Sequence, residues 1–178
     1  MSDRERQEIV DSLRKAVTFL ERSMNGALVP DSGSNIAYAT SKARDLRDVA
    51  TIQGRISRSG DHIAITGLPS FGECDEVARI VLTAMKFDPE IRSATVIGYS
   101  QKTVEVLKDL LYEVCSFDRA REPPGISTMD WGVASCCREG VPDAIFDRGA
   151  PGKEALIRIF AENPDELVNI IVKVSSRG

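Results

Sequence analysis

Helical and strand patterns alternate along the whole chain, and this alternation constrains the fold more than any single motif. Residues 4–24 carry apolar side chains at helical spacing from Ile9 to Met24, with charged residues on the other face. Residues 93–99 form a short apolar run typical of a buried strand. The links are short, and no Pro-, Gly- or Ser-rich linker divides the chain. The sequence therefore predicts one α/β domain over residues 1–178.

The same patterns predict the other elements of the domain. Helices are expected over residues 4–24, 75–86, 103–113, 128–138 and 167–174, and strands over 34–39, 55–58, 62–66, 93–99, 114–118, 142–146 and 155–161. Residues 43–50 are interpreted as a short helix or an irregular turn. Ser59-Gly60-Asp61 lies between two alternating runs and predicts a hairpin, so the sheet is not purely parallel.

The composition of the chain argues against nucleic acids and membranes as its partners. The net charge of -4 and the pI near 5.2 argue against a general nucleic-acid-binding surface, although a local basic pocket is compatible with both. No apolar run approaches the roughly 20 residues that span a bilayer, and the charged residues 1–8 lack the apolar core of a signal peptide. We expect a cytoplasmic protein that binds neither membrane nor nucleic acid directly. The predicted sheet has edge strands that a second copy of the chain could cover, so a homo-oligomer is compatible with the sequence.

The cysteines and the single histidine offer little for metal or acid–base chemistry. Cys74, Cys115, Cys136 and Cys137 show no C-x-x-C spacing and have no histidine nearby, which argues against a zinc site. We interpret most of them as buried free thiols that pack like small apolar residues. His62 lies in an alternating strand pattern, so a structural role is favoured over catalysis.

The turn at residues 147–154 is the strongest candidate for a ligand-binding loop. Gly149 and Gly152 allow a tight turn that approaches a ligand closely, and Arg148 and Lys153 bring positive charge that suits phosphate oxygens. Asp147 and Glu154 add carboxylates that could hold Mg²⁺ beside a phosphate. The pattern is not a Walker A loop. The alternative is a surface turn whose charges are solvated.

Seven segments in order resemble one known family, the ThiN-type thiamine-phosphate synthase domain of archaea, often found fused behind a hydroxymethylpyrimidine-phosphate kinase. The matching segments are residues 28–30 with 34–39, 54–56, 71–72 with 77–79, 88–92, 117–119 with 122–123, 129–132, and 142–149 with 152–154. Together they span nearly the whole chain. The resemblance implies a three-layer α/β/α fold with a mixed sheet, akin to the class-II aldolase fold group.

The resemblance also implies the chemistry. The synthase joins a hydroxymethylpyrimidine diphosphate to a hydroxyethylthiazole phosphate as diphosphate leaves. Such a site must stabilise departing negative charge, for which cations and usually Mg²⁺ serve. The candidate cations are Arg55, Arg119, Arg148 and Lys153, while Asp118, Asp147 and Glu154 would hold metal or orient those cations. Trp131 could stack on a heterocycle or pack in the core.

The chain departs from the family pattern at the start of the helix expected from residue 75. Glu76 stands where the family has a histidine, while the partner arginine is kept as Arg55. An ionised carboxylate cannot donate a hydrogen bond to a phosphate and repels it. Acidic residues also favour the first turn of a helix, which is the alternative explanation of Glu76. Val96 and Gly98 replace an Asn and a basic residue of the family.

Two functions are compatible with a site that keeps the charged turn and Arg55 but lacks the family's histidine. The favoured one is a domain that binds thiamine phosphate or its phosphorylated precursors, with lost or reduced catalysis and a ligand-binding or regulatory role. The alternative is an active synthase that uses the retained Arg55, Arg148 and Lys153. Regulation would need a partner chain or a longer parent protein, because the resemblance accounts for the whole length and leaves no DNA-binding domain.

Overall fold

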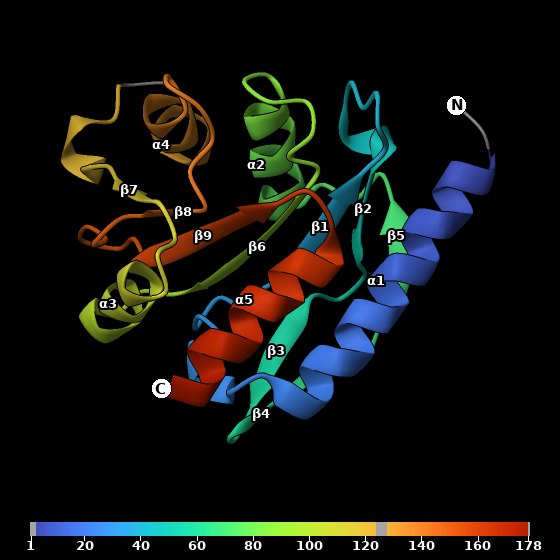
Figure 1. The fold of residues 1–178 in the computed structure, drawn as a ribbon, viewed down its shortest axis with the longest axis horizontal. Helices are drawn as coiled ribbons and strands as arrows, with labels where there is room; N and C mark the ends of the chain where they lie inside the picture. The colour runs from blue at the N-terminus through green and yellow to red at the C-terminus, as the bar shows by residue number, and fades with distance from the viewer. Residues whose placement is uncertain (1–2, 124–127, 178) are drawn as a thin grey trace.

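The fold is built on a seven-stranded sheet flanked by helices (Figure 1). The computed structural model describes residues 3–123 and 128–177, the side chains of residues 128–130 excepted. The strands of the sheet lie in the order β5-β2-β1-β6-β9-β8-β7, and β3 and β4 form a separate two-stranded hairpin. The strands are β1 Ile36–Ala39, β2 Val49–Ile52, β3 Ile56–Ser59, β4 His62–Ile65, β5 Pro69–Phe71, β6 Ser93–Gly98, β7 Val114–Ser116, β8 Ala144–Phe146 and β9 Leu156–Ala161. The helices are α1 Asp3–Ser23, α2 Glu76–Met85, α3 Gln101–Asp109, α4 Thr128–Cys136 and α5 Pro164–Arg177.

The sheet is mixed, as the sequence predicts. Its neighbouring strands pair antiparallel, except that β7 runs parallel to β8. In that parallel pair Ser116 lies opposite Phe146, so the two strands end side by side. The segments that follow β7 and β8 therefore leave the sheet at the same edge. This is the place where open α/β sheets characteristically bind ligands.

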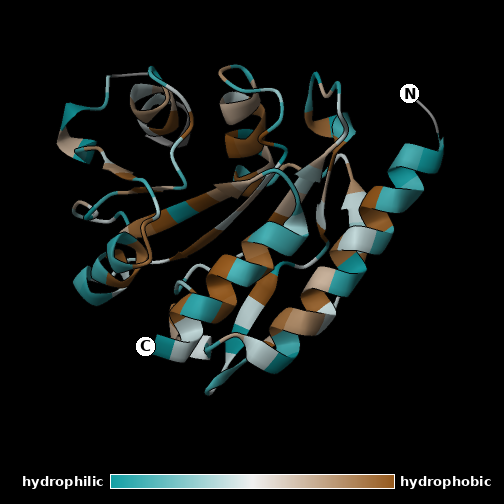
Figure 2. Ribbon diagram, viewed as in Figure 1, coloured by the Kyte–Doolittle hydropathy of each residue, from teal (hydrophilic) through white to brown (hydrophobic). Residues whose placement is uncertain are grey.

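Side chains that alternate along the strands divide the core into two layers, one on each face of the sheet. The first layer packs α1, α3, α5 and the β3–β4 hairpin against residues such as Ile36 and Ile97. The second packs α2 and α4 against residues such as Ala37 and Val96. Figure 2 shows the apolar stripes of α1 and α5 that this arrangement requires. The three-layer α/β/α prediction is confirmed, as is a single domain.

The prediction of a short helix or irregular turn over residues 43–50 is confirmed up to Asp48 and was wrong for Val49 and Ala50, which belong to a strand. A short 3₁₀ turn at Leu46–Asp48 leads into β2, whose four residues are all buried. β5 was also missed. The run Val49-Ala50-Thr51-Ile52 carries the β-branched residues typical of a buried strand, but it is too short for periodicity to separate it from a helix. β5 has three residues and borders the sheet, so its pattern is weaker still.

The interpretation of most cysteines as free thiols was wrong for two of them. Cys115 in β7 and Cys136 in α4 form a disulfide, with their Cα atoms 6.0 Å apart. The prediction holds for Cys137, which is buried, and burial raises the pKa of its thiol to about 11. Cys74 is free but exposed. Adjacent residues of a helix point in different directions, so Cys136 and Cys137 meet different partners.

The disulfide is expected to stabilise the fold. It joins residues 21 positions apart, and in the chain-entropy model closing a loop of this size is worth about 3 kcal/mol. Denaturant unfolding with and without dithiothreitol should show this difference in the free energy of unfolding, and Cys115→Ser should abolish the effect of the reductant. A thiol titration of the unfolded, unreduced protein should find two free thiols. Four free thiols would contradict the disulfide.

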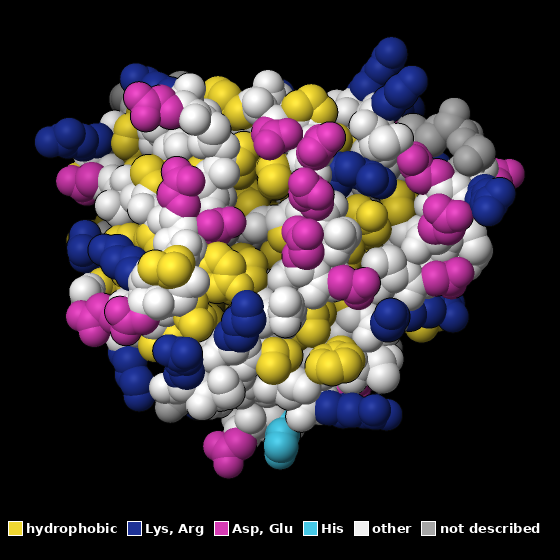
Figure 3. Space-filling model, viewed as in Figure 1, with side chains coloured by type: hydrophobic (Ala, Val, Ile, Leu, Met, Phe, Trp, Pro, Cys, Tyr) yellow, Lys and Arg dark blue, Asp and Glu magenta, His cyan; other side chains and the backbone are white. Residues whose placement is uncertain are grey.

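Basic and acidic side chains both occur on the face of the molecule that Figure 3 shows. On the side shown in Figure 3, the coloured Lys and Arg side chains lie mainly around the margins, with Asp and Glu side chains between them, and form no continuous basic area. Within residues 3–123 and 128–177, no helix is both long and apolar enough to cross a membrane.

Candidate functional site

The Asp147 carboxylate is the centre of the candidate site. It lies directly after β8, its side chain is fully buried, and it contacts two arginines. Arg119 Nε lies 2.9 Å from Oδ1, and Arg158 NH1 lies 2.9 Å from Oδ2. The Gly149 N–H also donates to Oδ1, at 2.7 Å. A carboxylate with these partners is held in one geometry, and it fixes in turn the segments that follow β7 and β8.

Arg158 was missed by the sequence analysis. Its side chain is fully buried in the middle of β9, between Ile157 and Ile159. Burial lowers the pKa of Arg158, and the Arg119 charge adds to this effect, while Asp147 and Glu76 oppose it. The signal was present in the sequence, since a lone cation inside an apolar strand requires a buried counter-charge. That counter-charge is Asp147.

A pocket of about 580 Å³ opens beside Asp147 at the shared end of β7 and β8. Its lining consists of Ser116, Phe117, Asp118, Arg119, Arg121, Trp131, Ser135, Arg148 and Gly149. The structure thus brings together five of the predicted ligand-binding residues: Asp118, Arg119, Trp131, Arg148 and Gly149. Arg121 was not singled out from sequence, although it follows Arg119 by two positions. The lining combines aromatic rings with guanidinium groups.

Aromatic side chains form one wall of the pocket. The Trp131 ring meets the Phe117 ring edge to face, with centroids 5.8 Å apart, and the Arg158 guanidinium lies 4.9 Å from the Phe117 centroid. Helix α4 approaches so closely that a Cβ at Gly132 would overlap the Phe117 ring. Trp131 is only partly buried, so its ring is available to the pocket as well as to the core.

The cations of the pocket differ in how firmly they are held. Arg119 is 8% exposed at its side chain and bound by Asp147, whereas Arg148 is exposed and lies 5.2 Å above the Phe146 ring. Asp118 is exposed, and its carboxylate accepts the Ala120 N–H at 2.9 Å, so it caps a 3₁₀ turn. Arg148 and Arg121, both exposed in the lining, are therefore more open to a ligand than Arg119.

The predicted ligand loop is a tight turn between β8 and β9. Ala150 and Lys153 exchange backbone hydrogen bonds of 3.1 and 2.8 Å, and Gly149 and Gly152 adopt φ values of 75° and 74° that favour glycine. Lys153 Nζ lies 2.9 Å from a carboxylate oxygen of Glu122. Gly152 and Lys153 are not in the lining of the pocket. The structure thus separates them from Arg148.

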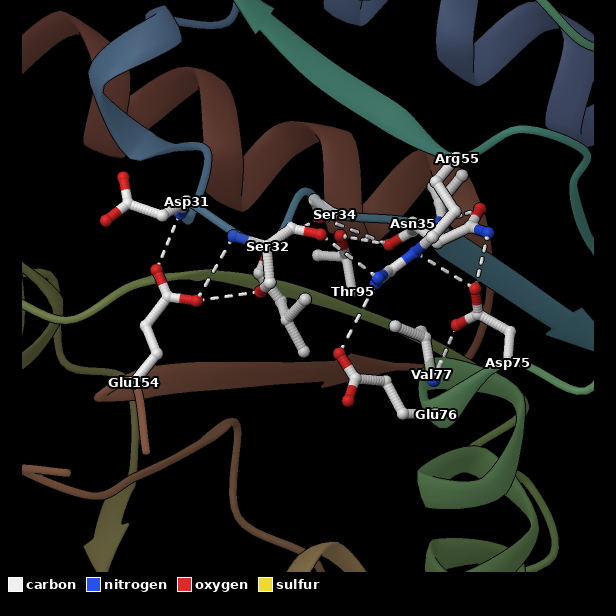
Figure 4. Close-up of polar contacts among 12 residues, drawn as sticks. Asp31, Ser32, Ser34, Asn35, Arg55, Asp75, Glu76, Val77, Thr95 and Glu154 are labelled. Carbon is white, nitrogen blue, oxygen red and sulfur yellow. Dashed lines mark hydrogen bonds and ion pairs between the residues drawn. The ribbon is translucent and has the colours of Figure 1, made fainter. Parts of the chain in front are cut away.

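Arg55 and Glu76 meet in a second polar cluster, at the start of α2 (Figure 4). Arg55 Nε lies 3.1 Å from Asp75 Oδ2, and Arg55 NH2 lies 3.4 Å from Glu76 Oε1. The Arg55 backbone has a φ of 62°, which is uncommon for a residue other than glycine. Buried Asn35 donates to Asp75 at 3.0 Å and so holds that carboxylate in place. The Arg55 guanidinium therefore faces two carboxylates.

Glu154 belongs to this second cluster rather than to the pocket. Its carboxylate accepts the Asp31 N–H at 2.6 Å, the Ser32 N–H at 3.3 Å and the Ser32 hydroxyl at 2.7 Å (Figure 4). The Ser32 carbonyl in turn accepts a hydrogen bond from Arg55 NH1 at 3.3 Å. Residues 31–33 and Arg55 also line a smaller pocket of about 390 Å³. Glu154 thus orients the backbone that contacts Arg55.

The magnesium site expected at Asp147 and Glu154 stays a prediction. Both oxygens of each carboxylate already accept hydrogen bonds or contact guanidinium groups. In the part of the chain that the structure describes, no group of three His, Cys, Asp or Glu side chains could hold a metal ion. Since the donor set does not fit a cation, we derive no chemical step through a metal.

The contacts of Glu154 predict a pH effect that Ser32 controls. Partial burial by itself raises the pKa of Glu154, but the hydrogen bonds from Ser32 and Asp31 outweigh it and lower the pKa below its ordinary value. Ionised Glu154 therefore stabilises the folded state at pH values above the pKa that Glu154 has in the unfolded chain. This contribution to the free energy of unfolding is lost as the pH falls through the lower pKa of the folded state. Ser32→Ala should raise the Glu154 pKa, as measured by carboxyl NMR titration. Ser176→Ala, an exposed serine near the end of α5 and outside the lining of the smaller pocket, is the control. An unchanged pKa would contradict the role of Ser32.

Comparison with known proteins matches the chain to one family over most of its length. The family model described as "Thiamine-phosphate synthase ThiN" matches residues 12–173. The bifunctional thiamine biosynthesis protein ThiDN of Methanocaldococcus jannaschii is 40% identical over 166 residues, which cover 92% of this chain and 39% of that protein. The chain therefore spans about two fifths of that relative's length. The thiamine-phosphate synthase ThiN of Methanothermobacter thermautotrophicus is 28% identical, with 93% of this chain and 91% of that protein covered.

Solved structures agree with the fold. The C-terminal domain of a phosphomethylpyrimidine kinase is 33% identical and superposes with a TM-score of 0.88, covering 96% of this chain and all of that domain. A sugar-phosphate aldolase from Thermotoga maritima reaches a TM-score of 0.56 at 9% identity, over 97% of this chain and 92% of that one. At such low identity the likeness shows the fold alone. The expected likeness of the fold to that of class-II aldolases is confirmed.

Proposed function

Since the chain belongs to the thiamine-phosphate synthase ThiN family, we propose that it binds a phosphorylated molecule of the thiamine pathway and that Glu76 lowers its synthase activity. One observation carries the proposal. The two clusters differ in how open their cations are, because Arg148 is exposed at a pocket while Arg55 faces Asp75 and Glu76. The first cluster remains able to bind an anion, and the second is already neutralised.

The pocket suits a ligand that combines a planar ring with a phosphate. Trp131 and Phe117 present aromatic surface, and Arg119 and Arg148 present guanidinium groups that bind phosphate oxygens bidentately. A volume of about 580 Å³ lies within the range of roughly 300–1,000 Å³ usual for small-molecule sites. Thiamine phosphate and its two phosphorylated precursors all combine a heterocycle with phosphate groups.

The pairing of Arg55 explains why synthesis would be slow. Departure of diphosphate develops negative charge that a free cation or a hydrogen-bond donor stabilises. Asp75 and Glu76 contact the Arg55 guanidinium instead, and a carboxylate at position 76 adds repulsion where an imidazole could donate. The ligand would therefore bind while the leaving group gains little stabilisation.

An active synthase is the second candidate, and a specific observation favours it. Arg119 and Arg148 line one pocket and could stabilise the leaving diphosphate without Arg55. The two candidates make opposite predictions for wild-type turnover, so one assay separates them.

Replacement of Glu76 tests the loss of catalysis. The assay supplies hydroxymethylpyrimidine diphosphate, hydroxyethylthiazole phosphate and Mg²⁺. Glu76→His should raise kcat by about 10²-fold, because removing one hydrogen-bond donor to the developing negative charge typically lowers kcat by about that factor. Glu76→Gln should give a smaller rise, because it frees Arg55 from one charge without supplying an imidazole. Product is measured as thiochrome fluorescence. The control is Glu73→Gln, an exposed neighbour that should change nothing. Wild-type turnover equal to that of Glu76→His would support the active synthase instead.

Replacement of Arg148 tests ligand binding. Arg148→Ala should weaken thiamine phosphate binding by about 10- to 100-fold in isothermal titration, the effect of one lost charge-assisted contact. Arg138→Ala, an exposed arginine outside the pocket lining, is the matched control. Equal affinities of the two variants would remove the pocket from the ligand site.

A further inference from the structure

We propose that Arg158 is a positioning residue, which acts through Asp147 to hold Arg119 ready for an anion in the pocket. The proposal rests on the proposed function and deepens it, because it assigns the phosphate of the ligand to the Arg119 side of the pocket. Nothing in the family resemblance points to Arg158.

The first step is the geometry of the three side chains. Asp147 Oδ1 lies 2.9 Å from Arg119 Nε, and Oδ2 accepts hydrogen bonds from Arg158 NH1 at 2.9 Å and from Arg119 NH2 at 3.4 Å. Arg119 lines the pocket, whereas Arg158 does not, and the Arg158 side chain is completely buried. Arg158 is therefore too deeply buried to line the pocket, and its contact with Asp147 and its position over the Phe117 ring connect it to the pocket wall.

The second step is charge. If Asp147 paired with Arg119 alone, the two charges would cancel and the pocket would offer an anion a neutral pair. Arg158 adds a second guanidinium to this pair, so the three contacting side chains together carry a net charge of +1, which Glu76 and Glu154 offset in part from a greater distance. Arg119 is only 8% exposed and Arg158 and Asp147 are fully buried, so solvent screens this charge poorly. A phosphate arriving at Arg119 would meet that attraction.

The third step is preorganisation. An arginine side chain has high rotamer entropy, and a ligand that must order it binds more weakly. Asp147 orders Arg119 in advance, and the same carboxylate fixes the Gly149 N–H at 2.7 Å, next to Arg148. Arg158 also stacks on Phe117, which meets Trp131 edge to face. One buried arginine thus supports both the cationic and the aromatic wall.

The test compares phosphate-dependent binding in two arginine variants. Arg158→Met removes the buried charge, and its affinity for inorganic diphosphate should fall by about 10- to 100-fold in isothermal titration. Arg158→Lys keeps the charge but loses the planar guanidinium contact, so its affinity for inorganic diphosphate should fall by a smaller factor. Arg6→Met is the matched control, since Arg6 pairs with Asp48 at 3.0 Å and lies 4.4 Å above the Phe71 ring, away from the pocket lining.

Two readouts separate positioning from a merely structural role. The ratio of thiamine phosphate affinity to thiamine affinity should drop in Arg158→Met, whereas general damage to the pocket would weaken both ligands alike. The double variant Arg119→Met with Arg158→Met should bind diphosphate no more weakly than Arg119→Met alone, because Arg158 acts through Arg119. Additive losses, or an unchanged affinity ratio, would overturn the proposal.

The remaining outcomes are also decisive. If Arg158→Met does not fold, Arg119→Met at the edge of the pocket carries the test, and retained diphosphate affinity in that variant overturns the proposal. If the wild type binds thiamine phosphate and folded Arg158→Met binds it equally well, the positioning role fails while the proposed function stands. If the wild type binds neither diphosphate nor thiamine phosphate and forms no product, both fail.

Discussion

The site depends on one buried carboxylate held between two guanidinium groups. Breaking such a buried pair by removing one partner typically costs about 3–5 kcal/mol, because the other charge stays buried without compensation. Asp147 therefore ties the end of β8 to the segment after β7 and to the middle of β9. The parallel register of β7 and β8 puts those segments side by side, and the disulfide from Cys115 to Cys136 ties α4 to the same edge. The pocket exists because these constraints meet at one place.

The second cluster is where the proposed function locates the reduced catalysis, because its cation already has anionic partners. The Arg55 guanidinium contacts the carboxylates of Asp75 and Glu76 and donates a hydrogen bond to the Ser32 carbonyl. Glu154, expected beside a phosphate, instead orients the backbone at Asp31 and Ser32. The two clusters also interact electrostatically. Burial lowers the pKa of Arg158, and the negative charge of Glu76 opposes this shift.

Much of the fold could be predicted from the sequence, because long periodic segments determine their own structure. The helical pattern before Met24 and the hairpin at Gly60 are local signals, and both appear as predicted. β2 and β5 have only four and three residues, so tertiary pairing decides their structure. The Cys115–Cys136 disulfide joins residues that only the folded sheet brings together. For the same reason the partner of Asp147 was not named from sequence, although Arg158 is a lone cation in an apolar strand.

A crystal structure of the protein with thiamine phosphate bound would test the account most directly. We predict that the heterocycle lies against Trp131 and that the phosphate oxygens lie within hydrogen-bond distance of Arg119 or Arg148, with the Arg55–Glu76 pair intact. A ligand bound at Arg55 with Glu76 displaced would contradict the account. So would density for the ligand anywhere other than the pocket at the shared end of β7 and β8.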